Sequence, residues 1–162
     1  MKSAMNKSVV TNIVFAGLGG QGVLKASDIA ADVASGADLD VKKSELHGMS
    51  QRGGSVTSDV RYGKQVFSPM VPPGEADYLV VLAPDQVEVA LPLLKKGGTL
   101  IEPSMLDESK LRNKKSTNVA LLGLLSKSLE FSDKQWMAAI QKNLPAKLYD
   151  VNVEAFQVGK DA

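Results

Sequence analysis

The sequence predicts an α/β protein: a Rossmann-like three-layer sandwich with a mostly parallel sheet, a β-hairpin and a helical C-terminal third. An apolar run over residues 9–16 ends in a glycine-rich turn at 17–22, and apolar residues then recur at helical spacing from Val23 to about Gly36. Residues 78–83 form a continuous apolar run, which is typical of a central parallel strand covered on both faces. Strand, glycine turn and helix together form the first half of a βαβ unit.

The stretch after this helix predicts a second strand and a hairpin. Residues 39–41 suit the second strand, whereas 44–54 show no clear period and are expected to form a loop. Apolar residues alternate from Val56 onward, with a turn at Gly63 and Lys64, so we expect a β-hairpin over 53–68. Three prolines, which lack the amide donor of a strand or helix, then enforce a loop: Pro69, Pro72 and Pro73.

A helix followed by a strand is expected after the central strand. Asp85 can cap a helix that ends at Gly97 and Gly98, although Pro92 should kink or shorten it. Residues 99–102 predict a further strand, and the polar, lysine-rich stretch 103–117 gives no assignment.

The last third of the chain predicts three helices. Residues 119–125 are apolar nearly all round, which implies burial in the core or against another chain. Ser132, with Gln135 three residues later, forms a capping box that opens the next helix, and its buried face contains Trp136, Ala139 and Ile140. A last helix is expected over 148–158, after Pro145.

The composition excludes several classes of function. The 162 residues carry a formal net charge of +1, so we expect no nucleic-acid or anionic membrane partner. No window approaches the roughly 18–20 apolar residues of a membrane span, and residues 1–10 do not form a signal peptide. We therefore expect one cytoplasmic domain.

The chain contains no cysteine and one histidine. Disulfides, thiolate zinc sites and protein-bound iron–sulfur clusters all need cysteine, and a lone His47 cannot build a metal site. Redox chemistry within this chain would therefore require a bound organic cofactor.

The glycine loop matches a nucleotide-binding pattern incompletely. Gly17, Gly19 and Gly22 have the spacing of the dinucleotide fingerprint, which brings a phosphate to a helix N-terminus. The acid expected at the end of the second strand, about 20 residues on, has no clear counterpart: Asp40 is slightly early and Glu45 slightly late. A structural or interface loop, a site for a phosphate-bearing ligand, and a nicotinamide or flavin site all remain open.

A second loop, over residues 44–55, concentrates polar groups between two expected strands. Arg52, followed by Gly53 and Gly54, could present a guanidinium and backbone amides to a carboxylate or phosphate. The alternative is a surface turn with a solvated arginine, and for His47 a structural role. No nucleophile–base pair and no two-carboxylate arrangement can be placed, so we predict no catalytic residue and no metal ligand.

Five segments together resemble the small subunit of 2-oxoacid:ferredoxin oxidoreductases. They are Phe-Ala-Gly-Leu-Gly-Gly-Gln-Gly-Val at 15–23, the loop at 45–55, Phe-Ser-Pro at 67–69, Glu-Ala-Asp at 75–77 and Asn-Val-Glu-Ala-Phe at 152–156. The run His-Gly-Met-x-Gln-Arg-Gly-Gly-Ser within the second segment is the most specific, and it looks most like the indolepyruvate type.

The resemblance implies a single gamma-type domain over 1–162, with its core at about 12–158, packed against a large catalytic subunit. In this family the partner uses thiamine diphosphate to decarboxylate a 2-oxoacid such as an arylpyruvate. Electrons pass through iron–sulfur clusters to ferredoxin, and the acyl group passes to coenzyme A. We expect the chain to bind none of these cofactors alone, to be inactive alone, to meet ferredoxin only indirectly and to be able to form a homodimer when isolated.

The two loops supply the candidate residues for a ligand or for the subunit interface near the partner's active site: Gly17, Gly19, Gly20, Gln21, Gly22, His47, Gln51, Arg52, Gly53 and Gly54. Two alternatives remain. One is a free-standing nucleotide-binding module, such as a dehydrogenase or redox sensor, and the other is a scaffold that docks through the helix at 119–125. The stretch 103–117 looks shorter than is usual in the family, where it holds another strand. The sequence therefore does not predict which strand forms the far edge of the sheet.

Overall fold

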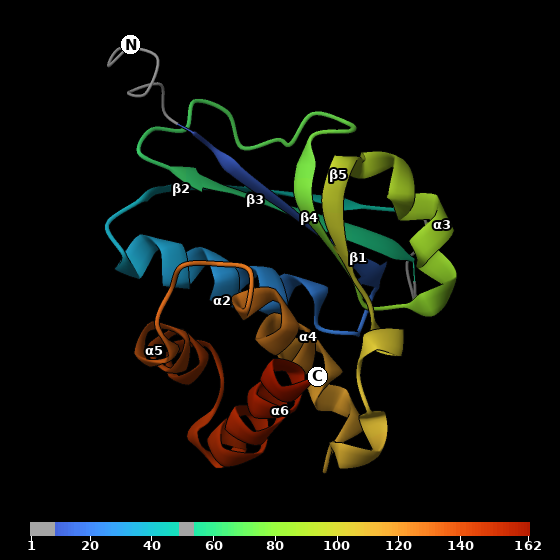
Figure 1. The fold of residues 1–162 in the computed structure, drawn as a ribbon, viewed down its shortest axis with the longest axis vertical. Helices are drawn as coiled ribbons and strands as arrows, with labels where there is room; N and C mark the ends of the chain where they lie inside the picture. Colours follow the sequence, from blue (N-terminus) through green and yellow to red (C-terminus); the bar gives the residue numbers. More distant parts are fainter. Residues whose placement is uncertain (1–8, 49–53) are drawn as a thin grey trace.

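The computed structural model describes residues 9–48 and 54–162, which form a five-stranded sheet with helices packed on it (Figure 1). The strands are β1 (Thr11–Leu18), β2 (Asp40–His47), β3 (Ser55–Gly63), β4 (Ala76–Val81) and β5 (Leu94–Ile101). The α-helices are α2 (Val23–Gly36), α3 (Val87–Ala90), α4 (Thr117–Ser126), α5 (Asp133–Asn143) and α6 (Tyr149–Asp161). The expected α/β class is confirmed.

The sheet has the strand order β2-β3-β1-β4-β5. β1 pairs with β4 and β4 with β5 in parallel, whereas β3 is antiparallel to both β1 and β2. Four of the five strands therefore run in one direction, as the prediction of a mostly parallel sheet requires. β3 is inserted between the two strands of the βαβ unit, so β1 and β2 are not neighbours.

The two faces of the sheet are covered unequally. Helices α2, α4, α5 and α6 lie together on one face (Figure 1), and they bury a core that includes Phe15, Leu121 and Trp136, each 0% exposed. The predicted burial of residues 119–125 is confirmed except at Leu124, which is half-buried. The other face has a smaller core, in which Val14 and Leu79 pack with the short helix α3.

The prediction of a hairpin over residues 53–68 is wrong. β3 continues to Gly63 and pairs with the full length of β2, so the hairpin is formed by β2 and β3. Consequently residues 44–47 belong to a strand, not to a loop. The segment at Val66, which was expected to form the second strand of that hairpin, has no regular structure. The Val66 N–H donates to the Asp40 carboxylate at 2.7 Å. Pairing on both sides places alternate residues of β3 in the core, which outweighs the local turn signal at Gly63.

The expected helix from Asp85 to Gly98 is also different. Only α3 is helical, between two 3-10 turns, and the second turn contains Pro92. The chain then enters β5, where Gly97 adopts a φ of 82° beside a break in the register with β4. A β-carbon on Gly98 would lie 3.0 Å from the Ala76 carbonyl oxygen. The two glycines thus form a β-bulge rather than a helix end.

The C-terminal third follows its prediction closely. The Ser132 hydroxyl accepts the Gln135 N–H at 3.1 Å and the Gln135 side chain accepts the Ser132 N–H at 2.8 Å, so the capping box is confirmed. Helices α4 and α6 cross in close contact at two glycines, because a β-carbon on Gly123 or Gly159 would overlap the backbone of the facing helix. Residues 103–116, which gave no assignment, form three 3-10 turns.

Candidate functional site

The glycine loop after β1 is braced from within by Gln21. Its side-chain oxygen accepts the N–H of Leu18 at 2.7 Å, and its own N–H donates to the Leu18 carbonyl at 3.2 Å. A β-carbon on Gly17 would lie 2.9 Å from the same side-chain oxygen. Gly17 therefore leaves room for the Gln21 side chain, and the Gln21 side-chain oxygen is occupied by the hydrogen bond from Leu18 that holds the loop in shape.

Gly22 lets helix α4 approach the loop. It has a φ of 82°, and a β-carbon there would overlap the side-chain amide of Asn118. The Asn118 amide donates to the Gly22 carbonyl at 3.2 Å. Packing thus explains Gly17 and Gly22, in line with the structural interpretation of those two positions. Gly20 is different, because it has a φ of 87° and open space around its α-carbon.

The structure brings the two predicted loops together. The Gly19 N–H donates to the Gly54 carbonyl at 2.9 Å, so the glycine loop meets the residue directly before β3 at the carboxyl edge of β1. His47 is the last residue of β2, and its side chain is 59% exposed, with its Nε2 atom 4.0 Å from Glu45. Three candidates, Gln51, Arg52 and Gly53, lie outside the described residues.

A cavity of about 660 Å³ opens beside this junction. It lies where β1, β4 and β5 end and α2 and α4 begin, the usual position of a ligand crevice in open α/β sheets. Its lining is Gly20, Gln21, Gly22, Leu82, Pro84, Pro103, Glu108, Lys114, Lys115 and Thr117. Two lysines against one glutamate, together with the free amides at the start of α2, suit a phosphate or carboxylate group.

Sequence reasoning missed the lysines of this cavity. Lys114 and Lys115 fall in the stretch 103–117, which has no period and gave no assignment. A usable signal was present, since a pair of basic residues lies four to five positions before the apolar run at 119–125. Basic residues before a helix that begins at the sheet crevice are positioned to meet an anion.

The acid of a dinucleotide site is missing from this edge. Asp40 begins β2 and therefore lies at its amino end, where the hydrogen bond from Val66 lowers the pKa of the carboxyl group. Glu45 lies nearer the correct edge but pairs with Lys43 at 3.6 Å. Because β3 separates β1 from β2, the end of β2 is about 10 Å from the glycine loop, twice the usual strand spacing. Neither of these two carboxylates is therefore placed to make the ribose contact of a nicotinamide site.

The residues present do not fit a thiamine-bound metal or an iron–sulfur cluster. Within residues 9–48 and 54–162 no three acidic, histidine or cysteine side chains gather as metal ligands, and the sequence has no cysteine. In the same described ranges, every helix is too short or too polar to span a membrane.

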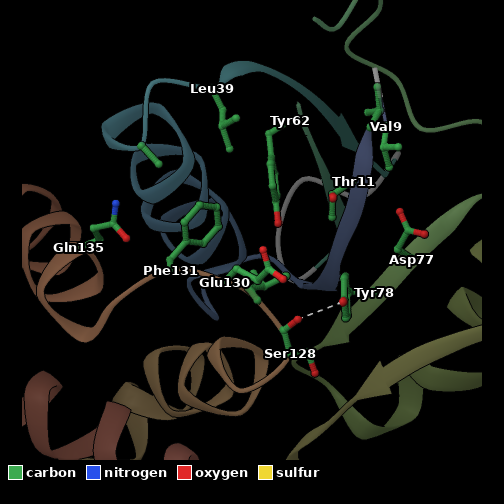
Figure 2. Close-up of a pocket in the computed structure, with 13 residues that line it drawn as sticks. Val9, Thr11, Leu39, Tyr62, Asp77, Tyr78, Ser128, Glu130, Phe131 and Gln135 are labelled. Carbon is green, nitrogen blue, oxygen red and sulfur yellow. Dashed lines mark hydrogen bonds between the residues drawn. The ribbon is translucent and has the colours of Figure 1, made fainter. Parts of the chain in front are cut away.

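A second cavity, of about 510 Å³, lies at the opposite end of the sheet (Figure 2). Tyr62 and Phe131 form its aromatic side, with ring centroids 5.5 Å apart, and burial raises the pKa of Tyr62 to about 12. The Tyr78 hydroxyl donates to the Ser128 carbonyl at 3.3 Å, and Asp77 pairs with Lys95 at 2.6 Å. The Tyr62–Phe131 and Tyr78–Ser128 contacts connect the sheet to the segment between α4 and α5, whereas the Asp77–Lys95 pair joins β4 to β5.

Comparison with known proteins identifies the family. The family described as "Pyruvate ferredoxin/flavodoxin oxidoreductase" matches residues 12–109. The indolepyruvate oxidoreductase subunit IorB of Thermococcus kodakarensis is 35% identical, over 93% of this chain and 95% of the relative. The subunit of the same name from Archaeoglobus fulgidus is 33% identical, over 91% and 92%.

Solved structures show the same fold at lower identity. The gamma subunit of a keto/oxoacid ferredoxin oxidoreductase from Geobacter sulfurreducens has a TM-score of 0.76 and 22% identity, over 94% of this chain and 95% of that one. The 2-oxoglutarate:ferredoxin oxidoreductase of Magnetococcus marinus has a TM-score of 0.80 and 18% identity, over 94% of this chain but 30% of that one.

The chain therefore belongs to the pyruvate ferredoxin/flavodoxin oxidoreductase family. Within the family it is a small, gamma-type subunit of a 2-oxoacid:ferredoxin oxidoreductase, of the kind named IorB in its relatives, which confirms the resemblance seen in the sequence. The alignment with the Thermococcus relative extends over 191 positions, more than the 162 residues of this chain. The relative thus contains insertions that this chain lacks.

Proposed function

We propose that the chain packs on a large, thiamine-diphosphate-dependent subunit and completes the cleft in which an acyl group is transferred to coenzyme A. The reaction of the complex is the oxidative decarboxylation of a 2-oxoacid, such as an arylpyruvate, with reduction of ferredoxin. The observation that carries this proposal is the junction of the two loops at Gly19 and Gly54, beside a cavity with two lysines.

The division of labour follows from what the chain contains. It has no cysteine for a cluster, and its described residues bring no metal-binding group together. We therefore assign decarboxylation and electron transfer to the partner, which also contacts ferredoxin. We propose a cytoplasmic location for the complex. The small subunit contributes by excluding water and orienting groups at the cleft, which can speed a reaction strongly without covalent participation.

Coenzyme A suits the cavity chemically. It supplies the thiol that accepts the acyl group, and its phosphates need cationic and amide donors. Lys114 and Lys115, with the backbone amides at the start of α2, provide such donors. The Magnetococcus structure, whose fold matches 94% of this chain, contains coenzyme A and succinyl-CoA, and this supports the assignment.

The test is kinetic and uses the reconstituted complex. Replacing Lys114 and Lys115 together by alanine is expected to raise the KM for coenzyme A by about 10- to 100-fold, because charge-assisted hydrogen bonds contribute about 1.5–3 kcal/mol. The KM for the 2-oxoacid should stay within about twofold. Lys110→Ala is the matched control, since Lys110 is an exposed lysine outside the cavity lining.

Two outcomes would contradict the proposal. One is an unchanged KM for coenzyme A in the double variant, and the other is an equal rise in the Lys110→Ala control. Arg52→Ala tests the second loop separately, and unchanged turnover together with unchanged coenzyme A affinity would remove Arg52 from the cleft.

A further inference from the structure

Strand β2 lies at one edge of the sheet, and in the described part of the chain no other strand pairs with its outer side. None of its eight residues is buried. An edge strand presents a row of backbone N–H and C=O groups that can pair with a strand of another molecule. The outer side of β2 is therefore open to a further strand.

Two hydrogen bonds determine which residues of β2 face outward. The Gly48 N–H donates to the Ser55 carbonyl at 2.6 Å, so the even-numbered residues of β2 bond to odd-numbered residues of β3. The Gly19 N–H donates to the Gly54 carbonyl, so β3 uses its even-numbered residues for β1, which agrees. The odd-numbered residues of β2 therefore direct their backbone groups to the open side: Val41, Lys43, Glu45 and His47.

The charges along this edge favour pairing with a second copy of the same strand. Two antiparallel copies related by a two-fold axis must place one residue opposite its own copy, because outward groups have to meet outward groups. Lys42, Lys43 or Glu45 at that centre would place like charges face to face, which is destabilising. With Ser44 at the centre, Lys43 lies opposite Glu45 of the second copy on both sides of the axis. This register also pairs all four outward residues, whereas registers centred nearer either end pair fewer.

The side chains around this edge are compatible with that register. Lys43 already pairs with Asp28 of α2 and lies 3.6 Å from Glu45 of its own chain, so the charged side chains are gathered on the face that carries α2. On the other face, Lys42 would lie opposite Leu46 of the second copy. Leu46 is 70% exposed in the single chain, and the methylene stem of a lysine can cover such an apolar side chain. Edge lysines also disfavour unselective pairing, so the edge is suited to its own copy rather than to an arbitrary strand.

We propose that two copies of the chain pair through β2, antiparallel and centred on Ser44, so that their two sheets join into one continuous sheet. The interface is symmetric, since the same edge is used by both copies. Within the oxidoreductase complex it would join two small subunits. The pairing does not depend on the proposed coenzyme A cleft, so the failure of either proposal leaves the other standing.

The first test is Ser44→Cys, since the chain has no cysteine of its own. Ser44 directs its backbone groups to β3, and opposite residues at such a position of the new pair have α-carbons about 4.5 Å apart, which is within disulfide range. Mild oxidation should therefore convert most of the chains into covalent dimers on a non-reducing gel. Lys42→Cys is the matched control, because it lies on the same face of β2 but its two copies would be about 14 Å apart, which no disulfide spans. Equal cross-linking of the two variants would overturn the proposal.

The second test uses Lys43→Glu and Glu45→Lys. Each variant alone places like charges opposite one another, so its dimer dissociation constant, measured by sedimentation equilibrium, should rise at least about tenfold. In an equal mixture of the two variants, the mixed dimer has only opposite charges at these positions and should recover the wild-type constant within about threefold. The same two proteins are measured apart and mixed, so a general defect of either variant cannot produce this recovery.

Two results of sedimentation would contradict the proposal. One is a mixture that associates no more strongly than the separate variants, and the other is a wild-type chain that stays monomeric at its highest soluble concentration. Circular dichroism checks that each variant is folded, and cross-linking of Ser44→Cys against Lys42→Cys decides the question if one is not.

Discussion

Replacing Gly22 by alanine is expected to destabilise the chain by about 2–3 kcal/mol. Gly22 has a φ of 82°, and its missing β-carbon leaves the space that the Asn118 amide occupies. A side chain in the left-handed region costs about 1–2 kcal/mol. Displacing Asn118 also removes its hydrogen bond to the Gly22 carbonyl, which is a loss of about 1 kcal/mol. For a domain of this size the melting temperature should fall by about 4–12 °C.

Gly20→Ala is the control for backbone strain. Gly20 has a similar φ of 87° but nothing within 4 Å of the β-carbon position, so this variant should show only the strain of about 1–2 kcal/mol. Pairing Gly22→Ala with Asn118→Ala removes the group that the new methyl overlaps. The double variant should therefore be less destabilised than the two single variants added together, by about 1 kcal/mol.

The assay is urea and thermal unfolding of the purified chain, followed by circular dichroism. The reasoning would be refuted if Gly22→Ala were no more costly than Gly20→Ala. Additivity of Gly22→Ala and Asn118→Ala would also refute it, because the overlap between the two positions would then contribute nothing.

Three further predictions concern stability. Ser132→Ala removes the helix cap that Gln135 completes and should lower stability by about 1 kcal/mol in urea unfolding; no change would mean that the cap is redundant. The Ser58 hydroxyl donates to the Ser27 hydroxyl at 2.8 Å, and both residues are 0% exposed. Ser27→Ala should therefore cost more, about 1–3 kcal/mol, than Ser58→Ala, because it leaves a buried donor without an acceptor; the reverse order in the same assay would count against this bond. Burial raises the pKa of Tyr62 from 10.0 to about 12, so the folded state disfavours its ionised form, and stability should fall as the pH rises from about 10 to 12. Tyr62→Phe should flatten that fall relative to wild type, with tyrosinate absorbance reporting the titration.

Local signals in the sequence predicted local structure well. The capping box at Ser132 and Gln135 and the helix after the glycine turn each depend on residues a few positions apart, and both are present. The central strand β4 was recognisable because burial on both faces requires an unbroken apolar run.

The failures arose where distant pairing decided between local alternatives. Gly63 and Lys64 look like a hairpin turn, but β3 already has a partner on each side, one of them β2. Lys95, Lys96 and the two glycines after them look like a helix end, yet they lie in an edge strand that exposes its polar side chains. Neither partner strand could be known from the residues within the segment itself.

The candidate site was predictable in part for the same reason. Both loops could be placed at strand ends from the sequence, whereas the hydrogen bond between Gly19 and Gly54 needed the fold. The role of Gly22 was hidden because Asn118 lies 96 positions further along the chain. The roles of Gln51, Arg52 and Gly53 remain predictions from the sequence, because these residues lie outside the described ranges.

The crossing of α4 and α6 at Gly123 and Gly159 affects how the cavity can respond to binding. Two helices in backbone contact cannot slide past one another without opening a gap, so they behave as a single rigid block. The first turn of α4, at Thr117, forms one wall of the cavity beside the glycine loop, and that wall is consequently anchored by the last helix of the chain. Any adjustment to a bound molecule is then left to the glycine loop and to residues 103–116.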